Sequence, residues 1–313
     1  MTDREAVFLE KLARTGLWQL PGLLQALPDE TARLSRLCYA ASPAGDWLDT
    51  PPEVFFSCAA HARYLRENVS WTRALPEPLF LAYVLHPRVN NEALCDCRPV
   101  FYAALAERLR GLPEEAAILE INRWCAEHVA YQPTDERTRS ALAVLRAGFG
   151  RCGEESMFAV NVLRACGFAA RQVYVPRWAH CDDNHAWVEV RCGGAWHFLG
   201  ACEPEAVLDR GWFNSAAGRA VLVHSRCFGE PEPGADLIGR EGDVVYCNET
   251  ARYADVRRLT VRVTDGNGVP AAGANVDFCV LNNCEWYPAA TVQTDASGMA
   301  ALTCGLGSLR LLA

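Results

Sequence analysis

The chain has 313 residues, half of them hydrophobic and 22% charged, a composition typical of a globular protein with room for two or three domains. Its formal net charge of −8, without any run of Lys and Arg, argues against nucleic acid as the main partner. No apolar run approaches the length of a membrane span, and no signal-peptide core follows the N-terminus. We therefore expect a cytoplasmic protein, or a cell-surface one if a leader was trimmed.

The cysteines do not predict a disulfide scaffold or a metal site. There are fifteen, an odd number, scattered along the chain, and no Cys-x-x-Cys motif occurs; Cys95 and Cys97 form only a Cys-x-Cys pair. A chain this long can build a full apolar core and does not need disulfides to fold. We expect most of these thiols to be small buried hydrophobes, and we expect neither a metal nor an organic cofactor.

The first third of the chain shows helical periodicity. Apolar residues recur at helical spacing over residues 54–65 and 100–109, and the charged segment 1–10 is typical of an amphipathic helix. Residues 112–128 give the strongest pattern, because Pro113 suits a first turn and two glutamates follow it at the positive end of the helix dipole. These features predict a helical domain over residues 1–110, followed by a core that begins with the helix at 112–128.

The pattern changes at Gly150. A second helix-like run covers residues 140–146, and a longer helix is predicted over 152–166, ended by Gly167. Strands are predicted at 169–175, 186–191 and 196–199, with Gly193 and Gly194 forming a hairpin turn between the last two. The segment 230–242 is rich in Pro, Gly and acidic residues, which predicts a loop.

Alternating apolar and polar residues dominate beyond Val256. Strands are expected at 259–263, 274–280 and 299–303, separated by acidic Gly-containing turns, which indicates a small β-sandwich. The chain stops within a strand-like pattern, and we expect the natural protein to continue. The predicted fold class is thus α+β, with domains at residues 1–110, 111–255 and 256–313.

Cys152 and His185 form the candidate catalytic pair. Cys152 follows Gly150 and opens the predicted helix, where the positive end of the dipole and a nearby imidazole can lower the pKa of a thiol. His185 lies at the head of a strand whose other face, with Ala186 and Val188, is apolar and suited to pack on that helix. The packing would leave His185 near Cys152, the arrangement of a thiol nucleophile and its base.

Each residue alone has a simpler interpretation. Cys152 is one of fifteen cysteines and His185 one of seven histidines, and a single residue of either type is usually structural. His180 and His197 are alternative bases, although His197 is expected to point away from the site. The case for Cys152 and His185 therefore depends on their order and spacing.

Three motifs carry a family resemblance. Gly150-Arg-Cys-Gly-Glu154, Leu163-Arg-Ala-Cys-Gly-Phe-Ala-Ala-Arg171 and Asn184-His-Ala-Trp-Val-Glu-Val190 resemble the transglutaminase-like superfamily of Cys-His-Asp enzymes. Trp196-His-Phe-Leu-Gly-Ala-Cys-Glu-Pro204 and Gly211-Trp-Phe213 are similar to its peptide:N-glycanase-like branch, although the zinc-binding Cys-x-x-Cys pairs of eukaryotic glycanases are absent. The resemblance spans about residues 115–225 and implies a papain-like core, with Cys152 as nucleophile and His185 as base. Separately, the segment from Leu259 resembles a carboxypeptidase-regulatory or Ig-like module.

The third catalytic residue departs from the family pattern. The family's aspartate usually lies four residues after the tryptophan of the third motif, a position that is Gly200 here. Glu203 matches a glutamate that is also common in the glycanase-like motif. Our hypothesis is that Glu203 orients His185 in place of the aspartate; the alternative is an incomplete triad, and loss of the orienting group costs on the order of 10⁴ in turnover.

Three further residues are candidate substrate contacts. Trp178 and Trp187 could wall a cleft, although an aromatic core is the more common role for such residues. Asp183, beside Asp182, could bind a basic substrate or a cation, with a solvated loop as the alternative. The oxyanion of the transition state would be bound by the backbone N–H of Cys152 and one further group.

These observations predict a thiol hydrolase that cleaves an amide or peptide bond of a protein, peptide or glycopeptide substrate. Two alternatives remain open: a catalytically weakened scaffold that binds a peptide or glycan, and a transglutaminase that transfers amines. The oligomeric state is not predicted by the sequence.

Overall fold

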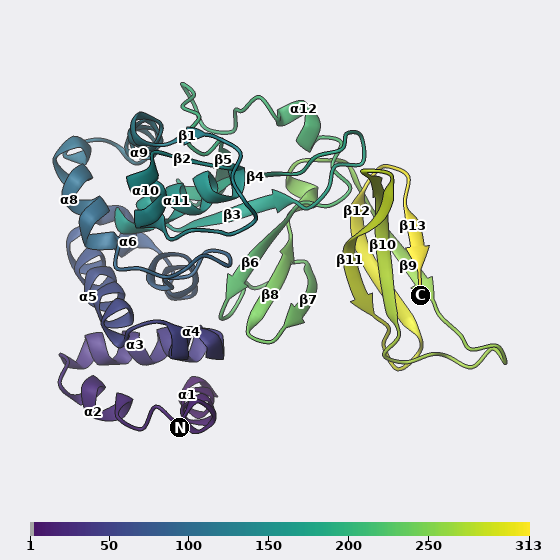
Figure 1. The fold of residues 1–313 in the computed structure, drawn as a ribbon, viewed down its shortest axis with the longest axis horizontal. Coiled ribbons are helices and arrows are strands. Elements are labelled where there is room, and N and C mark those ends of the chain that lie inside the picture. The colour runs from purple at the N-terminus through teal and green to yellow at the C-terminus, as the bar shows by residue number, and fades with distance from the viewer. Residues whose placement is uncertain (1–2) are drawn as a thin grey trace.

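The structure is a computed structural model that describes residues 3–313, and it confirms the α+β class. Helices of the N-terminal part lead into a six-stranded antiparallel sheet with a long helix against it, and the chain ends in two small β-sheets (Figure 1). Within the described residues, no helix has the length and apolar character needed to cross a membrane.

The helices cover most of the first 165 residues. They are α1 (Asp3–Thr15), α2 (Leu20–Gln25), α3 (Asp29–Ala41), α4 (Ala44–Asp49), α5 (Pro52–Asn68), α6 (Ser70–Ala74), α7 (Glu77–Phe80), the π-helical turn η1 (Leu81–Leu85), α8 (Arg98–Leu109), α9 (Glu114–His128), α10 (Ala141–Ala147), α11 (Cys152–Ala165), and later α12 (Asn214–Ala217) and the 3₁₀ turn η2 (Thr250–Arg252).

The strands are concentrated in the second half. They are β1 (Ala130–Tyr131), β2 (Phe149–Gly150), β3 (Ala170–Val175), β4 (His185–Cys192), β5 (Ala195–Leu199), β6 (His224–Phe228), β7 (Leu237–Glu241), β8 (Val244–Asn248), β9 (Val256–Arg262), β10 (Asn275–Asn282), β11 (Glu285–Gln293), β12 (Met299–Gly305) and β13 (Arg310–Leu312). The central sheet has the order β5-β4-β3-β6-β8-β7.

One face of the central sheet packs on α11. Side chains alternate across a strand, so Val188 and Val190 of β4 share the face of Ala170 on β3. All three are buried in one core with Met157 and Phe158 of α11, and helices α8, α9 and α10 contribute to the same core. This packing fixes the first turn of α11 beside the start of β4.

The opposite face of the sheet carries a buried ionic network. Arg171 of β3 donates from Nε to Glu189 Oε2 at 2.7 Å and lies 2.7 Å from Glu249 Oε2. Glu189 also accepts from Arg252 Nε at 2.8 Å and from the Tyr253 hydroxyl at 2.6 Å. Burial alone would raise the pKa of Glu189, but the two arginines outweigh it and the pKa is lowered. The network joins the sheet to the chain that leaves β8.

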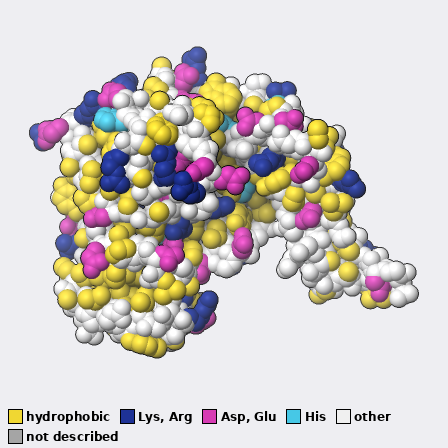
Figure 2. All heavy atoms as spheres, viewed as in Figure 1, with side chains coloured by type: hydrophobic (Ala, Val, Ile, Leu, Met, Phe, Trp, Pro, Cys, Tyr) yellow, Lys and Arg dark blue, Asp and Glu magenta, His cyan; other side chains and the backbone are white. Residues whose placement is uncertain are grey.

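The C-terminal β strands form two small sheets around a core of their own. The sheet of β12 and β9 and the sheet of β11, β10 and β13 enclose a cluster that includes Val276, Phe278 and Leu302. Val221 and Leu222 of the central part belong to the same cluster. In the space-filling view this part of the chain meets the main body along its upper edge and leaves an open notch below (Figure 2).

The structure contains several strands that the sequence did not predict, among them β6 and β8 of the central sheet. Residues 230–242, predicted as a loop, contain β7, which pairs with β8 at the edge of the central sheet. Strand β11 was not predicted, because Pro288 interrupts its alternating pattern; the register shift between Phe278 and Cys279 on β10 accommodates that proline.

Replacing Arg171 by Met should destabilise the fold strongly, because it leaves two buried carboxylates without their shared cation. We expect a loss of about 3–5 kcal/mol in the free energy of unfolding, measured by urea denaturation. Arg258→Met is the matched control, since the Arg258 guanidinium makes exposed contacts, with Asp236 at 3.9 Å and the Thr303 hydroxyl at 3.4 Å, and its loss should change stability by less than about 1 kcal/mol. Equal effects of the two variants would contradict this assignment.

Candidate functional site

Cys152 is the first residue of α11, as the sequence predicts. The turn before it is anchored by Glu154, whose buried carboxylate accepts from the backbone N–H of Arg151 at 3.3 Å, half of a capping box. Arg139 Nε and the Thr134 hydroxyl also donate to Glu154, at 2.7 and 2.8 Å. The thiol therefore projects from a backbone turn held at several points.

The Cys152 thiol lies against the start of β4. Burial raises the pKa of Cys152 and outweighs the nearby backbone N–H groups of Ala186 and Gly153, which favour the thiolate. The sequence predicts the opposite shift, because a helix terminus and a nearby imidazole both favour the thiolate. In the resting protein the thiol is thus protonated at neutral pH.

His185 is the first residue of β4 and is directly followed by Ala186, whose N–H meets the Cys152 thiol. Its ring is enclosed by aromatic side chains, with centroids 4.8 Å from Trp212, 5.1 Å from Phe213 and 5.8 Å from Trp187. Burial lowers the pKa of His185 to about 4, although the Asp183 carboxylate favours the charged form. The imidazole is therefore neutral at neutral pH and able to accept a proton.

The nitrogen Nε2 of His185 is buried and has no hydrogen-bond partner among residues 3–313. Neither Glu203 nor the Cys152 thiol forms a hydrogen bond with the ring in this described part of the chain. A buried nitrogen without a partner costs free energy, so this atom needs an explanation.

Glu203 occupies the space in which a side chain at position 200 would lie. A Cβ on Gly200 would fall 2.3 Å from Glu203 Oε2 and 3.0 Å from its Cβ. The Glu203 carboxylate accepts from Trp212 Nε1 at 2.9 and 3.0 Å, and Trp212 in turn packs on the His185 ring. Glu203 thus reaches His185 through an indole rather than by direct contact.

A second carboxyl group, Glu155, was not singled out from the sequence. It lies one turn after Cys152 on α11 and is 4% exposed. Burial raises the pKa of Glu155 to about 8, and the nearby Glu203 and Glu154 carboxylates add to the effect. Its position in the first turn of the same helix as Cys152 is the sequence feature that could have identified it.

The three predicted substrate contacts lie in different environments. Trp187 is fully buried and donates from Nε1 to the Tyr253 hydroxyl at 3.0 Å, and Trp178 is 3% exposed in the same aromatic core. Both positions match the alternative of a core role. Asp183 is exposed in the loop before His185, and its carboxylate accepts from the backbone N–H of Asn184 at 2.7 Å.

The first turn of α11 is also supported from β3. Gln172 Nε2 donates to Gly153 O at 2.9 Å and to the Ser156 hydroxyl at 2.7 Å, and Gln172 Oε1 accepts from Asn90 Nδ2 at 2.6 Å. Asn90, from the N-terminal part of the chain, is thereby linked through Gln172 to the backbone next to Cys152. Gln172 was not predicted, because nothing in the sequence pairs it with residue 153.

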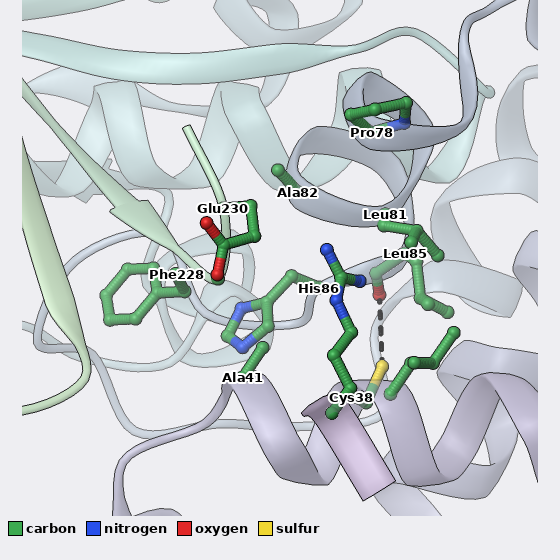
Figure 3. Close-up of a pocket in the computed structure, with 12 residues that line it drawn as sticks. Cys38, Ala41, Pro78, Leu81, Ala82, Leu85, His86, Phe228 and Glu230 are labelled. Atoms are coloured by element: carbon green, nitrogen blue, oxygen red, sulfur yellow. Dashed lines mark hydrogen bonds between the residues drawn. The ribbon is translucent and has the colours of Figure 1, made fainter. Parts of the chain in front are cut away.

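Two other histidines, His197 and His86, have partners elsewhere in the structure. His197 Nδ1 lies 2.6 Å from Asp209 Oδ2. His86 shares a cavity of about 10 Å³ with Cys38, between α3, η1 and the end of β6 (Figure 3). There the Ser42 hydroxyl forms a hydrogen bond of 3.1 Å with His86 Nε2. Burial raises the pKa of the Cys38 thiol far above its usual range. That pair is a structural one.

The described residues 3–313 contain no cluster of three or more His, Cys, Asp or Glu side chains able to hold a metal ion. What the site offers is a thiol, a neutral imidazole, two carboxyl groups and the free N–H groups of a helix start. These groups suit nucleophilic attack on a carbonyl followed by proton transfer.

Comparison with known proteins places this site in a family context. Residues 103–201 match the model of the Transglutaminase-like superfamily, so the chain contains a domain of that superfamily. The match includes Cys152 and His185 and ends before Glu203. Among solved structures, the chain is similar to one entitled "The Crystal Structure of a Putative Cysteine Protease from Cytophaga hutchinsonii", with 15% identity and a TM-score of 0.34 over 59% of this chain and 68% of that chain. No curated protein matches the sequence.

Gly200→Ala should disturb the site by displacing Glu203. A methyl group at this position requires the Glu203 side chain to move, and we expect a loss of about 1–3 kcal/mol in unfolding free energy together with a change in Trp212 fluorescence. Gly45→Ala is the control, because a Cβ there meets nothing within 4 Å. An unchanged stability in Gly200→Ala would show that Glu203 does not need this space.

The thiols should differ sharply in their pH dependence. A hydrogen bond from the Cys97 thiol, aided by backbone groups of Ala141 and Leu142, lowers the pKa of Cys95 to about 6. We expect iodoacetamide to label Cys95 near pH 6, and Cys152 only at pH values above about 8.5, the usual value for a free thiol. Mass spectrometry of the peptides resolves the two sites. Rapid labelling of Cys152 near pH 6 would instead indicate a preformed thiolate–imidazolium pair.

Proposed function

We propose that this protein is a cysteine-dependent hydrolase that cleaves an amide or peptide bond. The observation that supports it best is the contact of the Cys152 thiol with the N–H of Ala186, which directly follows His185. The thiol and the residue next to His185 thus come together in the fold although they are far apart in sequence. The resemblance to the peptide:N-glycanase-like branch extends the proposed substrates to glycopeptides.

In the proposed mechanism the resting pair is neutral, because burial raises the pKa of Cys152 and lowers that of His185 to about 4. The thiol loses its proton to His185 as sulfur attacks the substrate carbonyl, and the developing oxyanion is bound by the backbone N–H of Cys152. His185 then donates the proton to the leaving amine. Water hydrolyses the thioester and frees the enzyme.

Glu203 has a positioning role in this proposal. Its carboxylate fixes the Trp212 indole, and Trp212 with Phe213 restricts the rotation of the His185 ring. Trp212 is 66% exposed, so its outer face is available to a substrate. Because Glu155 is largely protonated at neutral pH, it does not place a second negative charge next to Glu203.

The second candidate function is a binding scaffold with weakened chemistry. The specific observation in its favour is the buried Nε2 of His185 without a hydrogen-bond partner in residues 3–313, together with Gly200 at the position of the family's aspartate. Amine transfer is the third candidate, and it differs from hydrolysis only in the molecule that attacks the thioester.

Incubation with a peptide mixture in ¹⁸O-labelled water separates these functions. Hydrolysis of any amide places an ¹⁸O atom in the new carboxyl group, whereas a labelled amine added to the mixture marks transfer products by its own mass. We expect ¹⁸O incorporation with the wild type and a decrease on the order of 10⁴ or more for Cys152→Ala and His185→Ala, because nucleophile and base act as a unit.

Cys95→Ser is the matched control, since it removes the more acidic thiol and leaves Cys152 in place. It should retain wild-type incorporation. Loss of ¹⁸O incorporation in Cys95→Ser but not in Cys152→Ala would show that Cys95 is the nucleophile and would contradict the proposal. Binding of peptides without any mass change would favour the scaffold.

A further inference from the structure

The loop that leads into His185 is held by the C-terminal module, residues 256–313. This loop, residues 176–184, connects β3 to β4 and is mostly exposed. It has a few bonds of its own, such as Trp178 N to Asp183 O and Asp183 N to Cys181 O, both at 2.9 Å. Such a long exposed connection between paired strands needs further partners to keep one conformation.

Asn282 supplies these partners. It is the last residue of β10, 2% exposed, and its Nδ2 lies 3.0 Å from Trp178 O, 2.8 Å from Cys181 O and 3.3 Å from Asp183 O. One amide group thus gathers three carbonyl oxygens of the loop. Burial of a side chain at a hairpin tip is unusual, and here it is explained by these acceptors.

The geometry of the β10–β11 hairpin places Asn282 against the loop 176–184. Asn283 and Cys284 form a two-residue turn with φ of +51° and +61°, and Asn282 pairs with Glu285 across it. The backbone N–H of Asn283 donates to Asp182 Oδ1 at 2.7 Å, and the Arg177 guanidinium lies 4.4 Å from the centre of the Tyr287 ring. The tip of the β10–β11 hairpin therefore contacts the loop at both of its ends.

A second attachment fixes the module to the central sheet. Gly305 at the end of β12 donates from its backbone N–H to Val221 O at 2.8 Å, and a Cβ there would fall 1.9 Å from Ala220 O. Two separate contacts define the orientation of a rigid body better than one. The module is not a freely hinged spacer; it lies against the strand β4 side of the main body (Figure 1).

We propose that Asn282 is a positioning residue, through which the C-terminal module fixes the loop 176–184 and thereby the place of His185 beside Cys152. The role of His185 as base in this statement rests on the proposed function. The β-module is then a part of the active site's architecture. Loss of its contacts with the loop would allow His185, the residue that takes the proton, to move away from Cys152.

Asn282→Ala tests the proposal in the full chain. We expect deuterium uptake of the peptide spanning residues 178–185 to become about tenfold faster, because three carbonyl acceptors lose their donor. The NMR titration of the His185 ring, identified by its disappearance in His185→Ala, should move from about 4 toward about 6.5 as water reaches the ring and leaves Asp183 as its nearest charge. Asn275→Ala is the control: Asn275 is exposed at the other end of β10.

Unchanged uptake and an unchanged His185 titration in Asn282→Ala would overturn the proposal. If deuterium uptake rises over the whole of residues 256–313, the module itself has unfolded. Asp182→Ala is then the deciding variant, because it removes the bond from Asn283 N–H to Asp182 by a change outside the module. Faster uptake confined to residues 178–185 in that variant supports the proposal, and unchanged uptake overturns it. Both readouts are independent of catalysis, so a wild type without ¹⁸O incorporation would refute the proposed hydrolase while leaving the positioning role intact.

Discussion

The packing of α11 on strands β3 and β4 is the constraint on which the site depends. Buried Val188 and Val190 share one core with Met157 and Phe158, and this packing brings the first turn of the helix to the first residues of β4. Because apolar burial is the main stabilising term in such a core, the meeting of Cys152 and Ala186 follows from it. The polar contacts of Glu154 and Gln172 then fix the turn in detail.

The same burial that assembles the pair also determines its charge state. A thiol at a helix start would be acidic if it were open to solvent, but the enclosed thiol of Cys152 has a raised pKa and the ring of His185 a lowered one. Because the resting pair is neutral, the proton must move from Cys152 to His185 while the sulfur attacks the substrate. The carboxyl groups nearby follow the same rule, since burial raises the pKa of Glu155 to about 8.

Two polar residues near the site, Glu203 and Asn282, act on His185 through other groups and not by direct contact. With glycine at position 200, the space next to the strand is filled by Glu203, which acts on His185 through the Trp212 indole. Similarly, the loop before His185 is held by Asn282, which belongs to another sheet. Both arrangements couple the imidazole to residues that do not touch it.

Local sequence patterns predicted several helices and strands and the candidate catalytic residues. Periodicity and turn residues predicted α9, α11, β3, β4 and β5, and the order of motifs pointed to Cys152 and His185, because these features depend on neighbours along the chain. These patterns could not predict β7, whose pairing with β8 overrides a loop-like composition, or the pKa shifts, which arise from burial by distant segments. Gln172, Trp212 and Asn282 gained their contacts only from the tertiary structure, since hydrogen bonds between residues about 10 to 100 positions apart leave no local pattern in a single sequence.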